Sequence, residues 1–325
     1  MDEPPELVAA YAAHHLWSGA SSVHIYLDRD DPRTRALLAP LDRVHVTVAD
    51  AGYWRREFDK KVPKTHQRRQ TLNATHAYTK RDVEFLLHLD ADEFLLQGEP
   101  IEKELKRLRT SRPDHYLRVG NLERVWRAGE AEGGMFDGAF RASTKHADED
   151  LSGLTLDAEG LTKFGLTGHS AGKAFTPTGY DYVLGIHRPH LDTPRPWTHP
   201  GIRRSTTSTI LHFDGVTPLH WVYKRLRKAH FLLTQPGQPV SPQMQAQIDV
   251  IGDGGLAAAR ALHDRIKVIG PDMQGALDAK SLWFDVDFDP SRALKALLPH
   301  AEIDLSAAVF DRWLRETKPE IFDLI

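Results

Sequence analysis

Hydrophobic and polar positions follow two different periods in the first ninety residues. Apolar residues recur with helical spacing in three segments, while three shorter segments alternate or are apolar throughout and are rich in β-branched side chains. Proline before a segment and glycine after it mark the ends of the first helix. The pattern predicts helices over 7–17, 31–38 and 64–80 and strands over 23–27, 44–48 and 83–89. Strands and helices in this order predict an α/β fold with a doubly wound sheet.

The later part of the chain has a different character. Residues 128–170 are rich in Gly, Asp and Glu and have little periodicity, which predicts a long irregular region. The remaining pattern predicts strands over 115–126, 180–187 and 209–213 and helices over 101–108, 219–233, 242–269, 291–298 and 305–316. A Gln- and Pro-rich break at 235–239 separates most of these helices from the rest. We therefore expect a domain over 1–235 and a C-terminal helical extension over 236–325.

Three carboxylates follow the predicted strand over 83–89. Asp90, Asp92 and Glu93 come directly after apolar residues, although an ionised carboxylate is costly to bury without a compensating cation. Ligands of open α/β sheets bind beyond the carboxyl ends of the strands. Asp90 and Asp92 bracket one residue, so both can approach one hard cation, Mg²⁺ or Mn²⁺, bridged to a diphosphate. The alternative is an acidic helix N-terminus after a strand.

Composition excludes several classes of protein. The net charge of −3 over 325 residues gives no basic field for nucleic acid. The absence of cysteine excludes disulfides and thiolate metal sites and suits a reducing compartment. We find no run of about 18 apolar residues that would predict a transmembrane segment. The acidic start with its two prolines is not a secretory signal. We expect a cytoplasmic soluble protein.

The segment Asp-Ala-Asp-Glu-Phe-Leu over 90–95 resembles the DxD element of glycosyltransferases with the GT-A fold. More narrowly, it is similar to the bacterial glycosyl transferase family 2-like group, whose strand ends in a D-x-D-E-F signature. Residues 6–15 and 19–28 resemble the first helix and second strand of that group, and 172–175 and 185–189 resemble its later Lys and Ile-His elements. The resemblance covers roughly residues 6–230 and is weakest between 127 and 170.

The resemblance implies a GT-A-like mixed sheet flanked by helices, and a hexosyltransferase. Asp90 and Asp92 would hold the diphosphate of a UDP- or GDP-sugar through Mn²⁺ or Mg²⁺. The sugar would pass to a glycan or another hydroxyl acceptor. The family usually opens with a short apolar strand that forms part of the base pocket, whereas this chain begins Met1-Asp2-Glu3-Pro4-Pro5. That strand is absent, or was lost from the start of the chain.

Further site residues follow from the same resemblance. A late histidine often completes the metal site, and His212 and His187 compete for this role, since a neutral imidazole suits Mn²⁺ beside two carboxylates. The helix over 64–80 would face the donor through Gln70 and Asn73, which share a helix face. Asp28 ends the second strand, where an acid contacts the base or ribose. For each residue the alternative is a structural role, in the core or on a solvated helix face.

Basic residues could stabilise the departing diphosphate. Lys173 and the helix over 219–233, which includes Lys224, carry suitable charges. Aromatic residues on the same helix also allow a peripheral contact with an anionic membrane surface. The alternative is an exposed basic helix face.

The general base is the least determined residue. Inverting transfer needs a carboxylate or histidine beside the acceptor hydroxyl, and the candidates are Glu123 and the acids Asp148, Glu149 and Asp150. Inversion is favoured over retention. Two alternatives remain: a non-catalytic relative that binds a glycan or a partner protein, and a metal-dependent phosphohydrolase. The second is disfavoured because the acids concentrate at one strand end.

Overall fold

The computed structural model describes residues 1–80, 83–130, 133–145, 147, 149–193, 198–234, 237 and 240–322. The chain forms two compact units, each built from three segments. Unit 1 comprises Met1–Asn121, Ala171–Ile210 and Pro290–Glu302, and unit 2 comprises Leu122–Ser170, Leu211–Asp289 and Ile303–Ile325. The expected division at 235–236 falls on two residues outside the described ones. Independent folding of 1–235 stays a prediction.

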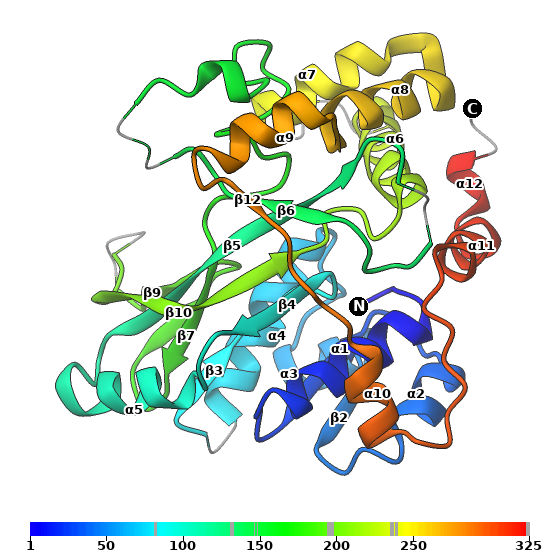
Figure 1. The fold of residues 1–325 in the computed structure, drawn as a ribbon. Coiled ribbons are helices and arrows are strands. Elements are labelled where there is room, and N and C mark those ends of the chain that lie inside the picture. The colour runs from blue at the N-terminus through cyan, green and yellow to red at the C-terminus, as the bar shows by residue number, and fades with distance from the viewer. Residues whose placement is uncertain are drawn as a thin grey trace. The chain divides into compact units, whose positions relative to one another are not determined.

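Unit 1 is a mixed α/β structure in which helices flank short sheets (Figure 1). Its helices are α1 (Pro5–Trp17), α2 (Pro32–Leu38), α3 (Ala51–Phe58), α4 (His66–Lys80), α5 (Glu102–Ser111) and α10 (Ser291–Leu297). Its strands are β1 (Val23–Leu27), β2 (Val44–Val48), β3 (Phe85–Leu87), β4 (Glu93–Gln97), β7 (Lys173–Pro177), β8 (Tyr182–Leu184) and β9 (Pro189–Leu191). Two further strands, β5 (Tyr116–Arg127) and β10 (Ile202–His212), begin in unit 1 and end in unit 2.

Helix α1 is the central helix of unit 1. Nine consecutive residues from Pro5 to Ala13 are buried, so the helix has no solvated face over that length. A helix that is apolar all round belongs in a protein core. It packs against α2, α10, β1 and β4, all of which belong to the same unit.

The strands of unit 1 take part in three separate sheets, one of which is the antiparallel pair of β8 and β9. Strands β1 and β2 pair in parallel, with Val23 opposite Val44 and Leu27 opposite Val48. Strand β7 pairs antiparallel with both β3 and the first half of β5, so that Leu87 and Leu117 each lie opposite Phe175. The expected doubly wound parallel order is therefore present in β1 and β2 but not in the pairing of β3. The apolar strand is also shorter than expected and ends at Leu87.

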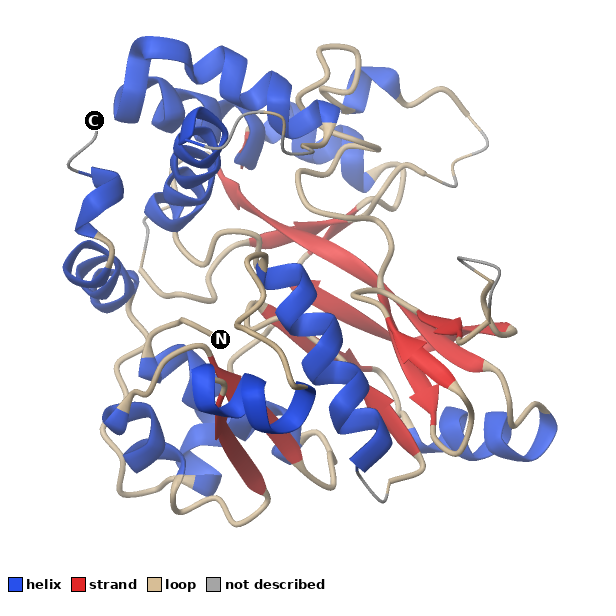
Figure 2. Cartoon of the chain, turned by 180° about the vertical axis from the view of Figure 1, so that it is seen from behind, coloured by secondary structure: helices blue, strands red, loops and turns tan. Residues whose placement is uncertain are grey.

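Helices are the main regular elements of unit 2, and Figure 2 draws the helices of the chain in blue and its strands in red. Its helices are α6 (Pro218–Thr234), α7 (Pro242–Ile251), α8 (Gly255–Lys267), α9 (Pro271–Asp278), α11 (Ala307–Thr317) and α12 (Pro319–Phe322), with two short 3₁₀ turns at Ser152–Leu154 and Gly252–Gly254. Strand β6 (Ala139–Arg141) pairs with β5 and with β12 (Trp283–Phe284), and β11 (Val268–Ile269) pairs in parallel with β5. Val125, Ala139 and Leu277 are among the residues of its core.

Over the described parts of the chain, no helix combines the length and the apolar character needed to cross a bilayer.

Candidate functional site

The acidic segment forms a closed turn between β3 and β4. The backbone N–H of Glu93 donates to the carbonyl of Asp90 at 3.1 Å. In return, the backbone N–H of Asp90 donates to Oε2 of Glu93 at 2.8 Å. These two bonds close the turn from both ends, with Asp92 at its third position. Glu93 therefore caps the turn.

Lys173, the first residue of β7, joins two of these carboxylates. Its Nζ lies 2.8 Å from Oδ2 of Asp90 and 2.8 Å from Oε2 of Glu93. The preceding Gly172 has a φ of +66°, and a Cβ at that position would lie 2.1 Å from the carbonyl oxygen of Val119. A residue with a side chain cannot adopt this conformation without a clash. Gly172 thus allows the chain to enter β7 so that Lys173 points at the turn.

Helix α4 connects the turn to the end of β1. Arg69 donates to both carboxylate oxygens of Asp28, at 2.9 and 2.8 Å. The next residue, Gln70, donates through its side-chain amide to Oδ1 of Asp90. One turn later, Asn73 accepts a hydrogen bond of 2.9 Å from the hydroxyl of Tyr53 and is buried. These side chains contact other residues of unit 1. They therefore do not form the solvated helix face that was the alternative expectation for Gln70 and Asn73.

Charge compensation keeps the acids of this cluster ionised. Burial raises the pKa of Asp90, but the ammonium group of Lys173 outweighs it, and the pKa lies below its ordinary value. Burial likewise opposes ionisation of Asp28, and the hydrogen bonds from Arg69 again leave a lowered pKa. Asp90 keeps 26% of its side chain exposed and Asp28 keeps 31%. Both carboxylates can therefore still be reached from solvent.

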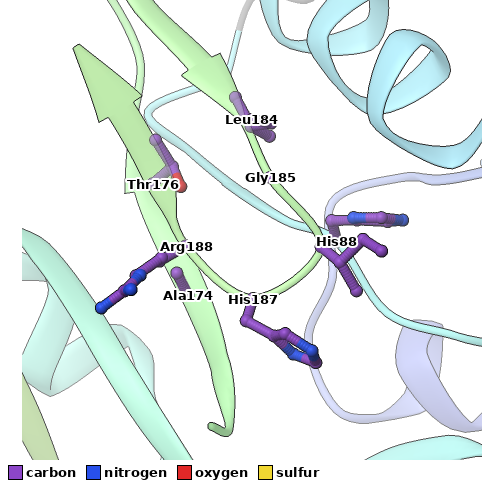
Figure 3. Close-up of a pocket in the computed structure, with 8 residues that line it drawn as sticks. His88, Ala174, Thr176, Leu184, Gly185, His187 and Arg188 are labelled. Carbon is purple, nitrogen blue, oxygen red and sulfur yellow. The ribbon is translucent and has the colours of Figure 1, made fainter. Parts of the chain in front are cut away.

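A small open pocket lies beside the turn, also in unit 1 (Figure 3). The space in it that a water-sized sphere can occupy is about 10 Å³, which is room for about one water molecule and far below the roughly 300–1,000 Å³ of sites for drug-sized ligands. Burial and the charge of Lys173 lower the pKa of His88, which favours the neutral ring. Nδ1 of His187, a proposed metal ligand, lies 3.2 Å from the carbonyl oxygen of Gly172. The lining residues are His88, Ala174, Thr176, Leu184, Gly185, Ile186, His187 and Arg188.

A second cluster of charges is enclosed in unit 2. Glu123, a candidate general base, is 1% exposed and pairs with Lys267 at 2.9 Å. Oε1 also accepts from the backbone N–H of Thr167 at 2.9 Å, and Oε2 accepts from that of Gly168 at 2.6 Å. Although burial raises the pKa of Glu123, Lys267 and these donors leave it lowered. A lowered pKa opposes the proton uptake that a general base needs.

Asp214 extends this second cluster. Lys224 lies 2.7 Å from Oδ1 of Asp214, and Arg225 lies 3.2 Å from Oδ2. These cations overcome the effect of burial and hold the pKa of Asp214 well below its ordinary value. Lys224, expected to contact a diphosphate, is thus engaged by a buried acid of its own unit. The hydroxyl of Thr167 lies 2.7 Å from Asp214 Oδ2 and 2.9 Å from Glu123 Oε1, so its proton can serve only one at a time.

Two histidines in unit 2 could hold a metal ion. The rings of His169 and His212 stack with centroids 5.0 Å apart, and each offers a ring nitrogen within 4.8 Å of the other. A Cβ on Gly168 would lie 2.7 Å from Cε1 of His212 and 2.8 Å from Oε2 of Glu123. Only glycine fits at that position, and it allows both side chains to approach the loop. His212 was expected as a metal ligand, whereas His169 was not.

Two of the remaining base candidates, Glu149 and Asp150, lie on the surface. Asp150 is exposed and accepts a hydrogen bond of 2.9 Å from the backbone N–H of Ser152, and Glu149 pairs with Lys280 at 2.7 Å. Asp148 lies outside the described residues. Asp150 is thus bonded within its own loop, Glu149 pairs with a lysine 131 residues away, and the base assignment stays a prediction.

The structure thus brings together only some of the predicted site residues. Asp28, Gln70, Asp90 and Lys173 meet in unit 1 through α4 and β7. Sequence reasoning missed Lys267, Thr167 and His169. One signal could have identified Lys267, because it follows His263 by one helical turn on the buried face of α8.

No protein-family model, no curated protein and no solved structure gives a significant match to this chain.

Proposed function

We propose that this protein is a metal-dependent glycosyltransferase with a GT-A-like fold that uses the carboxylate cluster of unit 1 to bind a nucleotide-sugar. The observation that carries the proposal is the arrangement around α4. Adjacent residues of this helix, Arg69 and Gln70, contact the acid at the end of β1 and the first acid after β3. Two acids from separate strands therefore lie within reach of one small ligand. Such a convergence at strand ends is typical of ligand sites in α/β proteins.

The donor set fits Mg²⁺ or Mn²⁺. Each oxygen of Asp90 accepts one hydrogen bond, from Gln70 or from Lys173, and a carboxylate oxygen has a second lone pair available. Asp92 supplies a further carboxylate two residues away in the same turn. Hard cations of this kind prefer oxygen ligands. Asp90 and Asp92 would hold the ion, which when bound offsets the negative charge of the diphosphate.

Lys173 has a positioning role in this proposal. It holds Asp90 and caps the turn through Glu93, so it fixes the orientation of the first acid before any ligand binds. Its side chain is completely buried, which excludes direct approach of solvent to the ammonium group. Asp28 and Arg69, at the end of β1, would contact the nucleoside. UDP- and GDP-sugars are the proposed donors, and a glycan hydroxyl is the proposed acceptor.

A non-catalytic nucleotide-binding protein is the second candidate. One observation favours it: Glu123 is enclosed and engaged by Lys267 and the N–H groups of Thr167 and Gly168, while Asp150 and Glu149 form surface contacts. Binding of a nucleotide-sugar without release of nucleoside diphosphate would favour this second candidate. Release of UDP or GDP from the donor would favour the transferase.

The binding experiment uses calorimetric titration of UDP and GDP, with Mn²⁺ and with EDTA. The variants are Asp92→Asn and a matched control, Asp42→Asn, which alters an exposed acid elsewhere in unit 1. We expect Mn²⁺-dependent binding in the wild type and the control and its loss in Asp92→Asn. Absence of binding in the folded wild type, or equal binding in Asp92→Asn, would overturn the proposal.

A further inference from the structure

One face of the small antiparallel sheet in unit 1 carries a set of residues that the proposed function does not use. Arg118 of β5 lies opposite Ala174 of β7, and Thr176 of β7 lies opposite Leu86 of β3. Because alternate residues of a strand point to the same face, these four side chains share one face of the sheet. Lys173 is the neighbour of Ala174 and points to the other face, toward the carboxylate cluster.

Two more arginines reach this face from neighbouring segments. Arg188, in the turn between β8 and β9, lines the small pocket together with Ala174 and Thr176. Figure 3 shows its side chain extending away from His88 and His187. Arg204 lies near the start of β10, where the carbonyl of Gly201 accepts a hydrogen bond of 2.9 Å from the backbone N–H of Tyr116.

The charges of Arg188 and Arg204 act on Arg118. Burial lowers the pKa of Arg118, and the positive charges of Arg204 and Arg188 lower it further. The same three guanidinium groups act on the hydroxyl of Tyr116, which shares the face of Arg118. Burial raises the pKa of that hydroxyl and the arginines oppose the rise. An anion placed between like charges would reduce their mutual repulsion.

We propose that Arg118, Arg188 and Arg204 form a binding site for a phosphate-type oxyanion. Planar guanidinium groups match the oxygens of phosphate in pairs of parallel hydrogen bonds. The site goes beyond the proposed function, because it uses the opposite face of β7 from Lys173 and requires no metal.

Thermal unfolding of the full chain in EDTA tests this site, with inorganic phosphate compared with chloride at equal ionic strength. The test variant is Arg204→Gln. The matched control is Arg203→Gln, because Arg203 is also exposed but points to the other face of β10. We expect phosphate to raise Tm in the wild type and in the control. In Arg204→Gln the phosphate Kd should rise about tenfold or more, the usual effect of losing a hydrogen bond to a charged group.

A second arm compares inorganic phosphate with glycerol 1-phosphate and adds Arg188→Gln. Tighter binding of the ester would identify the occupant as the phosphoryl group of a larger substrate, and equal binding would identify a free phosphate ion. Either result supports the arginine site if both Arg188→Gln and Arg204→Gln weaken the binding of the phosphate compound. No rise in Tm with phosphate in the wild type, or the same loss in Arg203→Gln as in Arg204→Gln, would overturn it. The EDTA keeps this outcome independent of metal-dependent nucleotide binding.

Discussion

The two units use the same kind of ionic contact for different purposes. In unit 1, Lys173 joins Asp90 and Glu93, and Asp90 keeps 26% of its side chain exposed. In unit 2, Lys267 pairs with Glu123, and each is 1% exposed. Both lysines are buried, so the difference lies in the carboxylates. The first arrangement leaves an acid that a ligand can reach, while the second is enclosed.

This difference shows why an acidic residue after a strand is a weak indicator of catalysis. The number of donors around a carboxylate decides how much capacity remains for a substrate or a metal. Asp90 accepts two hydrogen bonds through its side chain, from Gln70 and Lys173. Glu123 is held by Lys267 and by two backbone N–H groups, with the hydroxyl of Thr167 also in reach. Glu123 therefore contributes mainly to the stability of unit 2.

The largest effect should come from removing the buried cation of unit 2. In Lys267→Met the Glu123 carboxylate stays buried without its counter-charge, so the free energy of unfolding should fall by about 3–5 kcal/mol. Chemical denaturation measures this loss. Lys280→Met is the control, because Lys280 pairs with Glu149 at the surface and should change stability by less than about 1 kcal/mol. Equal losses of unfolding free energy in the two variants would show that the buried Lys267–Glu123 pair matters no more for stability than the surface pair.

Acid should destabilise both units through buried histidines. Burial lowers the pKa of His15 in unit 1 to about 3 and that of His263 in unit 2 to about 4, from an ordinary value of 6.5. Below pH 6.5 the unfolded chain therefore binds protons that these folded rings do not, and stability is lost as the pH falls. For His15 the loss at pH 5 should be about 2 kcal/mol.

The variant His15→Phe isolates this contribution. The free energy of unfolding, measured by denaturation between pH 7 and pH 5, should depend less steeply on pH, by about 1.4 kcal/mol per pH unit near pH 5. His300→Gln is the control, since His300 is exposed in the same unit. An unchanged slope in His15→Phe would mean that His15 does not stay neutral in the folded state.

The smallest effect on stability should come from the accessible cluster of unit 1. Gln70→Ala removes one hydrogen bond to Asp90 and should lower the free energy of unfolding by about 1 kcal/mol. The same variant should weaken Mn²⁺-dependent nucleotide binding in calorimetry, because Asp90 loses a group that orients it. Gln67→Ala, an exposed position on the same helix, should change neither quantity. A large loss of stability in Gln70→Ala with unchanged nucleotide binding would contradict this expectation. It would show that the cluster of unit 1 stabilises the fold and does not bind the ligand.

The sequence predicted most of the longer elements. Strands β1 and β2 have the predicted bounds, and α6 spans Pro218–Thr234 where a helix over 219–233 was predicted. Short elements were missed, among them β4, β6 and β7, because three to five residues are too few to show a period that separates a strand from a loop. The helix α3 was also missed, although Asp50 caps it through the backbone N–H of Tyr53.

The sequence by itself determined where most of the longer helices and strands form and which segment carries the acids, because these depend on the spacing of side chains along the chain. It did not determine the partners of those acids. Asp90 meets a lysine 83 residues later, and Glu123 meets one 144 residues later. Contacts of this range form only when the chain returns and closes a core. For this reason, the tertiary structure alone decided which carboxylate became accessible and which became enclosed.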